Sequence, residues 1–307
     1  MMLNHQYLLL PHLVVTEANA MSCAYATGFP AVTSFLGLGY ALTYKIPNFH
    51  FYGMGIVVHR AEFKSVLPNG SFAQKLMLKK APSVPDANGK AKAASMCMKG
   101  FVNLEVSLVI ECDDCRSSEK EKLEKEILPE LLPRMRLAGG DIHPIPFKRK
   151  EKKDDEPAYQ ESRLPCFFSN TAKDYRSLIR RLMPGYALVS RIDLMDGQCD
   201  GDALNRLVYA LSAKAIPLPK KKDDEKVSYE YNRHCKGWLL PLAVGFHDLS
   251  DNLTVANQRE ASYEHHFVEP LMTLCEFKMP YHFGSIRDLL WHYEYDENAH
   301  NYLCINE

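Results

Sequence analysis

An arginine and two glycines lie close enough in the sequence to hold a phosphate group. Arg136 comes three residues before Gly139-Gly140, within the segment Met135 to Ile142. A guanidinium group binds phosphate oxygens through parallel hydrogen bonds. Glycine has no side chain to block a ligand and adopts positive φ angles readily. The segment is either a phosphate-binding loop or a plain Gly-Gly turn, and taken alone it favours the turn.

Three arginines further along the chain have the spacing of one helix face. Arg176, Arg180 and Arg181 lie at positions i, i+4 and i+5, and Arg191 ends the apolar run that follows. Residues three or four apart are neighbours on a helix surface. A cationic helix face near a sheet suits the phosphates of a nucleic acid. An ordinary solvated helix face explains the same pattern equally well.

An aromatic residue and several histidines have weaker settings. Trp238, one of only two tryptophans, follows Gly237 in an apolar run, where it either packs in the core or stacks on a base. His59 ends an expected strand and has no identifiable partner, which favours a structural role or an RNA contact over catalysis. The pair His265-His266 lies in an acidic stretch and is interpreted in the same way.

The cysteines do not form a recognisable metal site. Cys112 and Cys115 have the spacing of zinc ligands, but no second pair of cysteines or histidines accompanies them, so a turn at a strand end is preferred. The chain also has no glycine-rich nucleotide motif and no serine-centred nucleophile elbow. We therefore expect no metal, no cofactor and no catalytic residues.

The expected elements of the first half place the Gly-Gly segment between a helix and a strand. They are a strand at Tyr7 to Val15 near a sheet edge, a helix from Thr33 or Ser34 to about Tyr44, strands at Phe51 to His59 and Phe101 to Cys112, a helix with a capping box of Ser118 and Glu121 that Pro129 and Pro133 end, and a strand at Ile142 to Ile145. This β-α-β, arm, β-α-β order predicts an α+β fold with a ferredoxin-like (split βαβ, RRM-like) domain over residues 1–147. A basic thumb arm is inserted at residues 62–100, and its flanks are expected to pair.

The second half, residues 148–307, is less regular and is expected to pack on the sheet and to contact partners. Its expected elements are a helix opened by Thr171 and Asp174 and stopped by Pro184-Gly185, a strand at Tyr186 to Ser190, an apolar strand pair or extended segment at Gly237 to Phe246, and a last helix opened by Ser285 and Asp288. The charge-dense stretches at 148–155 and 217–226 are interpreted as linkers.

Bulk composition points to a globular chain that works in a reducing compartment. The chain has 307 residues, with 46% hydrophobic and 24% charged residues, as in ordinary soluble proteins. No apolar run approaches the roughly 20 residues of a membrane helix, and no secretory signal is evident. Nine cysteines are scattered without a framework. These features predict a cytoplasmic protein that does not contact a membrane.

The net charge of −1 hides a strong segregation of charge. Eight lysines or arginines and two acids lie between Arg60 and Gly100, whereas eight acids and two basic residues lie between Glu264 and Glu307. A near-neutral chain with one basic arm and one acidic end is suited to different partners at its two ends. Charge runs are also typical of solvated faces.

Ten short blocks together resemble a known family. They are Leu8–Pro11, Ala18–Ala20 with Ser22, Gly28–Pro30, Gly55–Arg60, Leu104–Leu108, Met135–Ile142, Arg180–Arg191, Gly237–Leu239, Phe267–Glu269 and Asp288–Trp291. In this order they resemble the Csy-family backbone subunit of the type I-F CRISPR surveillance complex, within the repeat-associated RNA-binding superfamily. Residues 148–173 and 192–236 do not align, so nothing is carried onto them.

The resemblance implies a non-catalytic subunit that caps the 5′ handle of the CRISPR RNA. In the family, this subunit pairs with the large Csy subunit and abuts the terminal copy of the repeated backbone subunit, and target DNA is met only through the complex. The arm after the second strand acts as a thumb over the guide. Carried onto matching positions, the resemblance implies handle contacts at Asn19, Ser22, Arg60, Arg136, Gly139, Gly140, Arg191, Trp238 and Arg259. The charge of the arm adds Lys79 and Lys80.

Two other functions remain in competition. The first is an endoribonuclease of the same superfamily that processes CRISPR RNA. Such enzymes typically use a histidine in or near the first helix, and here Ser34 to Tyr44 contains none, while His50 comes only after Pro47. The second is a protein-binding scaffold whose charges serve solubility, for which RNA affinity would not depend on salt.

Overall fold

The structure is a computed structural model that describes residues 5–66, 75–76, 79–80, 85, 88–90, 96–97, 100–144, 164–195, 201–218, 229–250, 255–258, 262–263 and 265–306. The first half contains β1 (His5–Asn19), α1 (Val32–Lys45), β2 (Phe51–Phe63), β3 (Ser65–Val66), β4 (Lys75–Leu76), β5 (Lys79–Lys80), β6 (Met96–Cys97), β7 (Phe101–Asp113), α2 (Ser117–Lys122), η1 (Leu123–Ile127), α3 (Leu128–Leu131), η2 (Leu132–Arg134), β8 (Arg136–Leu137) and β9 (Gly140–Ile142). The expected β-α-β, arm, β-α-β order is therefore present.

The second half contributes mostly strands. Its elements are β10 (Cys166–Ser169), α5 (Ala172–Arg181), β11 (Tyr186–Ser190), η3 (Ile192–Met195), α6 (Ala203–Leu211), β12 (Ala213–Pro217), β13 (Tyr229–Arg233), β14 (Leu239–Asp248), β15 (Val268–Lys278), η4 (Pro280–His282), η5 (Arg287–Leu289), β16 (Leu290–Asp296) and β17 (Asn301–Ile305). The predicted strand at Tyr186 to Ser190 is confirmed, and so is the helix opened by Thr171, whose hydroxyl accepts a hydrogen bond from the backbone of Asp174.

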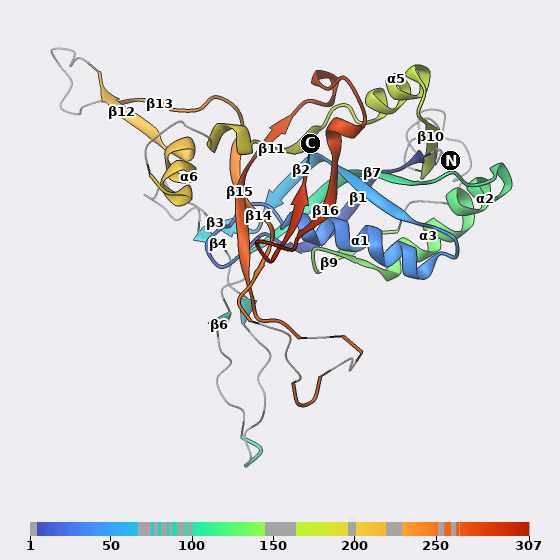
Figure 1. Cartoon of the computed structure of the whole chain (residues 1–307), viewed down its shortest axis with the longest axis horizontal. Helices are drawn as coiled ribbons and strands as arrows, with labels where there is room; N and C mark the ends of the chain where they lie inside the picture. Colours follow the sequence, from blue (N-terminus) through green and yellow to red (C-terminus); the bar gives the residue numbers. More distant parts are fainter. Residues whose placement is uncertain are drawn as a thin grey trace.

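One antiparallel sheet joins the two halves of the chain. Its 11 strands run in the order β11-β15-β14-β17-β16-β2-β7-β1-β9-β8, and β10 pairs with β1 beside this row (Figure 1). The first-half strands lie in the order β2-β7-β1-β9, and the C-terminal strands extend the sheet beyond β2. This mixed architecture agrees with the α+β class expected from the sequence. The division at residue 147 stays a prediction, because strands from both sides of it share the sheet.

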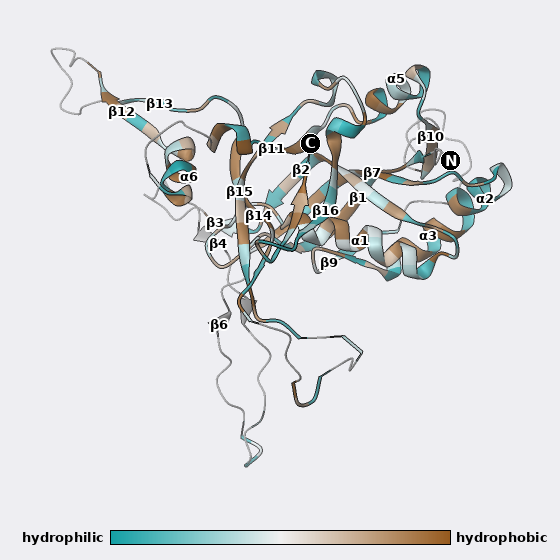
Figure 2. Ribbon diagram, viewed as in Figure 1, coloured by the Kyte–Doolittle hydropathy of each residue, from teal (hydrophilic) through white to brown (hydrophobic). Residues whose placement is uncertain are grey.

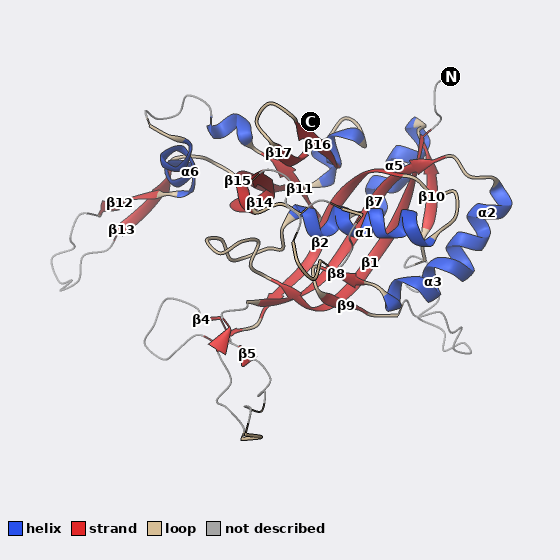
Figure 3. Ribbon diagram, turned by 60° about the horizontal axis from the view of Figure 1, so that its bottom comes forward, coloured by secondary structure: helices blue, strands red, loops and turns tan. Residues whose placement is uncertain are grey.

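Both faces of the central strands are covered. Alternate residues of a strand point to opposite faces. Leu8 and Leu10 of β1 pack in the core beneath α1, whereas Tyr7 and Leu9 pack in a second core beneath Leu178 of α5. Figure 2 shows long apolar stretches in these strands, and Figure 3 shows α1 lying across β2, β7 and β1. Each Å² of apolar surface removed from water contributes roughly 25 cal/mol, so this double core is the main source of stability.

The arm leaves the sheet as paired strands. β3 pairs with β4, and β5 pairs with β6, so Lys79 lies opposite Cys97 and Lys80 opposite Met96. The expectation that the flanks of the arm pair is therefore confirmed. In Figure 1 β6 of the arm lies away from the sheet, below β14 and β15. α6 and the β12–β13 hairpin project from another side of the molecule.

The predicted start of the second helical region was wrong. The helix begins at Ser117, and the carboxylate of Glu119 accepts the backbone N–H of Arg116 at 3.0 Å, so Ser118 and Glu121 form no capping box. Glu121 instead pairs with Lys125 on the next turn. A reciprocal cap requires the serine to precede the first helical residue, and here the chain enters the helix two residues too early for that.

Pro129 does not end this helix. The chain widens into a π-helical turn at η1, continues through α3, and stops only after η2, which contains Pro133. Proline lacks an N–H, and its ring clashes with the carbonyl group four residues before it. A π-turn directly before Pro129 moves that carbonyl group away, so the helical path continues.

The predicted last helix is also wrong. Only one 3₁₀ turn forms at η5, after which Leu290 begins strand β16. The carboxylate of Asp288 does accept the backbone N–H of Ser285 at 3.0 Å, as a helix cap would. However, β16 pairs with β2 and β17, and the ring nitrogen of Trp291 donates to the carbonyl oxygen of Leu188 at 2.8 Å. Tertiary pairing therefore overrides the helical spacing of the apolar residues.

The strand β1 has neighbouring strands on both sides, and its pairing with them is interrupted near Pro11. The pairing of β1 with β7 shifts register between Leu10 and Leu13, and His12 has a φ of 49°. β10 pairs with the start of β1, and β9 pairs with Val15 and Thr16, so Pro11 lies between these partners. This is how a residue without an N–H is accommodated.

The apolar segment at Gly237 to Phe246 forms a single strand, β14, between β15 and β17. The predicted strand at Ile142 to Ile145 ends at Ile142, and residues from 145 to 163 lie outside the described part. No helix in the described part of the chain combines the length and apolarity that crossing a bilayer requires.

Candidate nucleic-acid interface

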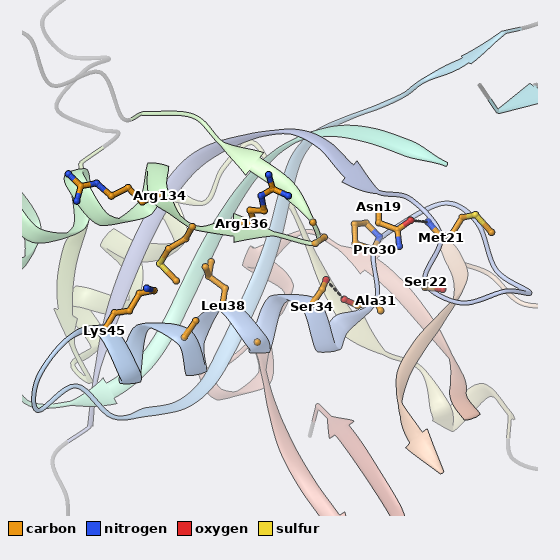
Figure 4. Close-up of a pocket in the computed structure, with 15 residues that line it drawn as sticks. Asn19, Met21, Ser22, Pro30, Ala31, Ser34, Leu38, Lys45, Arg134 and Arg136 are labelled. Atoms are coloured by element: carbon orange, nitrogen blue, oxygen red, sulfur yellow. Dashed lines mark hydrogen bonds between the residues drawn. The ribbon is translucent and has the colours of Figure 1, made fainter. Parts of the chain in front are cut away.

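A pocket of about 430 Å³ opens between α1, the loop after β1 and the segment before β9. Figure 4 shows its walls. It is lined by Asn19, Met21, Ser22, Pro30, Ala31, Ser34, Gly37, Leu38, Ala41, Lys45, Arg134, Met135, Arg136, Ala138 and Gly139. Four of the residues expected to contact RNA, from two separate sequence blocks, therefore meet here: Asn19, Ser22, Arg136 and Gly139.

Three cations stand on two walls of the pocket. Lys45 comes from the last turn of α1, and Arg134 and Arg136 come from η2 and β8 on the opposite wall (Figure 4). The Nε atom of Arg136 lies 3.4 Å from the carboxylate of Asp141, its partner across the β8–β9 hairpin, and its side chain is 72% exposed. Its two terminal nitrogens have no partner among the described residues, so one edge of the guanidinium group can bind an anion.

Asn19 joins the loop after β1 to the Gly-Gly segment. Its backbone N–H donates to the carbonyl oxygen of Ala138 at 2.8 Å. Its side-chain carbonyl oxygen accepts the backbone N–H of Met21 at 3.1 Å, which fixes the orientation of the amide. Within the described structure no group binds the NH₂ end of this amide, so it is available as a hydrogen-bond donor at the pocket wall.

Ser22 has a hydroxyl group that is buried and without a hydrogen-bond partner in the described part of the chain. The backbone around it is well bonded, since its N–H donates to the carbonyl oxygen of Ala26 at 3.1 Å. Native proteins rarely leave a buried polar group unsatisfied, because doing so costs about 1–3 kcal/mol. Ser22 lines the pocket, but its oxygen has no surface open to solvent, so a polar ligand can bond this hydroxyl only after a small movement of the loop around it.

The two glycines have different roles. Gly139 is exposed, has a φ of 76°, and has open space where a side chain would stand. Gly140 is buried, and an added Cβ would lie 2.6 Å from the carbonyl oxygen of Thr16 and 2.7 Å from the backbone nitrogen of Ala18. Gly140 therefore allows β9 to approach β1, and Gly139 is the glycine that presents bare backbone to the pocket.

A second hollow of about 600 Å³ shares a wall with the pocket. Its lining includes Asn19, Ser22 and Gly139, together with Glu17 and Phe101 at the base of the arm. Together the two hollows form a path from the Gly-Gly segment towards the arm.

Arg60 lies near the base of the arm but lines neither hollow. Its side chain is exposed and forms an ion pair with Glu62. Lys64, two residues further on, donates to the carboxylate of Glu17 at 3.0 Å. Lys79 and Lys80 lie on β5 of the arm, and Arg259 lies outside the described residues.

Arg191 and Trp238 lie elsewhere in the fold. The guanidinium group of Arg191 forms ion pairs with Asp193, at 2.9 Å, and with Glu276, whose side chain is only 10% exposed. Hydrogen bonding to Asp193 raises the pKa of Arg191, and that bond lowers the pKa of Asp193. Arg191 therefore has carboxylate partners already, and it neutralises a nearly buried charge.

The Trp238 ring is 57% exposed and packs edge-on against Tyr186 and Phe277. Phe277 in turn contacts Phe29 in the loop that precedes α1. Trp238 is thus held by its edges in the fold while much of its surface remains open to solvent. Such a ring can stack on a base, although it does not line the pocket.

The sequence did not predict that Ser34, Leu38, Lys45 and Arg134 would line the pocket. Lys45 ends the helix and Arg134 stands two residues before Arg136, and both facts were visible in the sequence. Their meeting was not, because it depends on how α1 crosses the sheet relative to η2.

The histidine and cysteine candidates have structural settings. His59 bonds the carbonyl oxygen of Pro184 and, at 2.6 Å, the hydroxyl of Ser107, and burial lowers its pKa. Cys112 ends β7 in the core, and the thiol of Cys115 donates to the carbonyl oxygen of Asp113 in the turn that follows. Burial raises the pKa of both thiols.

The fold and the site together define an α+β protein with a cation-rimmed polar pocket on one face of its sheet. Residues 8–304 match the family CRISPR-associated protein (Cas_Csy2), and the chain belongs to this family. It is 29% identical over 305 residues to the CRISPR-associated protein Csy2 of Pseudomonas aeruginosa (strain UCBPP-PA14), covering 93% of this chain and 90% of that one. The resemblance to the Csy subunits of type I-F CRISPR complexes is thereby confirmed.

Proposed function

We propose that the chain is the RNA-binding subunit that caps the 5′ handle of the CRISPR RNA, and that the pocket beside α1 holds part of that handle. One observation carries this proposal. Asn19 and Ser22 come from one block of the sequence, Arg136 and Gly139 come from another, and all four converge on one pocket. Asn19 and Ser22 were expected from the resemblance alone, so their meeting with the Gly-Gly segment in space is independent support.

The pocket offers the two kinds of contact that single-stranded RNA requires. Phosphates fit at Arg136, Arg134 and Lys45, which position the strand without reading its sequence. The NH₂ group of Asn19 and the hydroxyl of Ser22 fit the edges of an unstacked base. The volume of about 430 Å³ is within the range of small-molecule sites, roughly 300–1,000 Å³.

The fold supports the same proposal. The strand order β2-β7-β1-β9, with α1 and the α2–η2 helical region on one face, is compatible with the ferredoxin-like, split βαβ fold. That fold is a common platform for RNA recognition. We propose residues 1–147 as a domain of this fold and the arm as its inserted thumb.

The remaining expected contacts have peripheral places in the proposal. Lys79 and Lys80 on the arm and Arg60 at its base follow the guide RNA away from the pocket. Trp238 offers a stacking surface, and Arg259 stays a proposal from the resemblance alone. Gly140 and Arg191 shape the fold around the contacts. The proposed partners are the large Csy subunit and the repeated backbone subunit, in the cytoplasm, with DNA met through the complex.

The alternative function is processing of the CRISPR RNA. The described lining of the pocket contains no histidine and no carboxylate, and Lys45 is its only group other than arginine that can transfer a proton. A metal-independent cut at a defined position in precursor RNA, made by the chain alone, would establish this alternative.

Competition for guide RNA tests the proposal. The chain is co-expressed with its large Csy partner, and the affinity of the purified pair is measured for RNA with the authentic 5′ handle and for RNA of the same composition with a scrambled handle. We expect clear discrimination by the wild-type pair. The variant Arg136→Ala should weaken binding, whereas Lys125→Ala, which removes one charge from the far helix, should not. Equal affinity of the wild-type pair for both RNAs would refute the proposal.

A further inference from the structure

The outer side of α5 carries three cations that have no carboxylate partner among the described residues. Lys173, Arg176 and Arg180 are exposed and lie at i, i+3 and i+7, so they form one line along the helix, about 4.5 and 6 Å apart in rise. A hollow of about 480 Å³ opens along this line, and Ser177 lies in its lining. The small side chain of Ser177 lets an anion approach the helix between the arginines.

No acid among the described residues forms an ion pair with Lys173, Arg176 or Arg180. Elsewhere in the described structure, exposed cations are commonly paired, as Lys64 is with Glu17 and Lys125 with Glu121. The acid of α5, Asp174, is held at the helix start, where its carboxylate accepts the backbone N–H of Ser169 at 3.0 Å. Nothing on the helix therefore neutralises the line, and its positive charge faces solvent.

Arg181 is separated from this line. Its guanidinium group lies 5.7 Å from the centre of the Phe168 ring and donates to the Cys166 thiol at 3.1 Å. The expectation that Arg176, Arg180 and Arg181 share one face is therefore wrong for Arg181, which turns towards β10. Lys173 takes the third place on the cationic face.

The cationic line lies on the opposite side of the sheet from the pocket. α1 packs on Leu8, Leu10 and Ile56, whereas Leu178 and Leu182 of α5 pack in the core that contains Leu9, Val57 and Val109. A strand bound in the pocket beside α1 lies above the first of these faces. An anion bound to α5 is therefore a different segment or a different molecule.

We propose that the outer face of α5 binds the phosphate backbone of a nucleic-acid duplex. A row of long cations on a convex helix contacts phosphates without reading bases. Single-strand sites add exposed aromatic platforms, but the Phe168 ring beside α5 is buried under Arg181, and the Tyr175 hydroxyl is bonded to the carbonyl oxygen of Phe283. This surface goes beyond the proposed handle-binding function and does not depend on it.

Duplex binding by the full chain tests this assignment. The anisotropy of a labelled DNA duplex of arbitrary sequence is followed across a range of salt concentrations, with and without saturating unlabelled handle RNA. The triple variant K173A/R176A/R180A should bind the duplex about tenfold more weakly at low salt, and its salt slope should fall by about 0.9 for each lost phosphate contact. An RNA duplex and the matching single strand serve as parallel probes.

The control K120A/K122A/K125A removes the same charge from α2 and η1 and should leave duplex binding near that of the wild type. The variant R176K/R180K keeps the charges and should restore most of the affinity, while handle RNA should bind all of these proteins equally. An unchanged salt slope in K173A/R176A/R180A overturns the proposal. So does preference for the single strand, or displacement of the duplex by handle RNA. If the wild-type chain binds the duplex but has no preference for the authentic handle, the proposed function fails and the duplex-binding proposal stands.

Discussion

The backbone N–H of Asn19 donates to the carbonyl oxygen of Ala138 at 2.8 Å. This bond ties the end of β1 to the Gly-Gly segment, two parts of the chain more than a hundred residues apart. Ala138 accepts a φ of 50° beside Gly139 at 76°, and that turn directs the carbonyl group towards Asn19. The bond therefore holds the backbone of Asn19 against the hairpin that carries Arg136 at the pocket.

Gly140 should be required for stability, and Gly139 much less so. An alanine at position 140 would place its Cβ within 2.7 Å of the β1 backbone, which cannot move without breaking the sheet. We expect Gly140→Ala to lower the free energy of unfolding by about 3 kcal/mol. Gly139→Asn, the control, keeps a residue that tolerates positive φ and should cost under about 1 kcal/mol. Denaturant titration compares the two, and equal stability would contradict the different roles given to them.

Ser22→Ala should separate binding from folding. The hydroxyl is buried without a partner, so its removal should leave the free energy of unfolding unchanged or slightly raised. If the hydroxyl bonds RNA, affinity for the authentic handle should fall roughly fivefold, which corresponds to one net hydrogen bond. Thermal unfolding and RNA titration of the same preparation give both quantities. A destabilised variant with normal RNA affinity would show that the hydroxyl serves the fold.

Arg191→Ala should destabilise the chain without changing the RNA contacts directly. It leaves the nearly buried Glu276 with only Lys278, 3.5 Å away, as a charged partner, which should cost up to about 3 kcal/mol. The double variant R191A/E276Q should recover part of that loss, because it removes the poorly compensated charge. Chemical denaturation of both variants tests this. If Arg191→Ala kept full stability but lost RNA affinity, Arg191 would be a direct RNA contact.

The stability of the fold should fall as the pH drops below about 6.5. Burial lowers the pKa of His59 from its ordinary value of 6.5, so the unfolded chain takes up a proton in this range before the folded chain does. Protons therefore favour unfolding from pH 6.5 down to the lowered pKa. His59→Asn should flatten this part of the pH profile of the unfolding free energy. A variant profile parallel to the wild-type one would assign the dependence to other groups.

The arm should contribute charge and not folding energy. Lys79→Ala with Lys80→Ala should weaken retention of RNA and reduce the salt slope by about 0.7 for each lost contact with single-stranded RNA. The melting temperature should stay the same, since β5 and β6 pair outside the main sheet. Loss of folded protein would show instead that the two lysines are structural.

Local sequence patterns predicted the elements whose own spacing and capping agree with their place in the fold. Alternating or continuous apolar runs gave β1, β2 and β7, and a capping threonine with a Pro-Gly stop gave α5. The failures lie where distant partners decide. Ile286, Leu289, Leu290 and Tyr293 have helical spacing, but β2 and β17 pair with this segment from Leu290 onward and make it a strand.

The residues of the candidate site also divide into those that the sequence predicted and those whose place depends on distant packing. Arg136, Gly139, Asn19 and Ser22 were predicted through resemblance, because short blocks preserve the residue types. Lys45 and Arg134 were not, since their place depends on how α1 crosses the sheet. Arg191 was expected at RNA because an arginine at a strand end resembles a phosphate ligand, and only the structure shows Glu276 beside it.

Crosslink mapping is the most direct test of whether the pocket beside α1 holds part of the 5′ handle. The chain with its large Csy partner is bound to guide RNA that carries a photoreactive base in the 5′ handle, irradiated, digested and analysed by mass spectrometry. We expect crosslinks at the two pocket walls, in peptides that contain Asn19 to Ser22 and Arg134 to Gly139. Handle crosslinks confined to α5 or to the β12–β13 hairpin, with none at these walls, would contradict it.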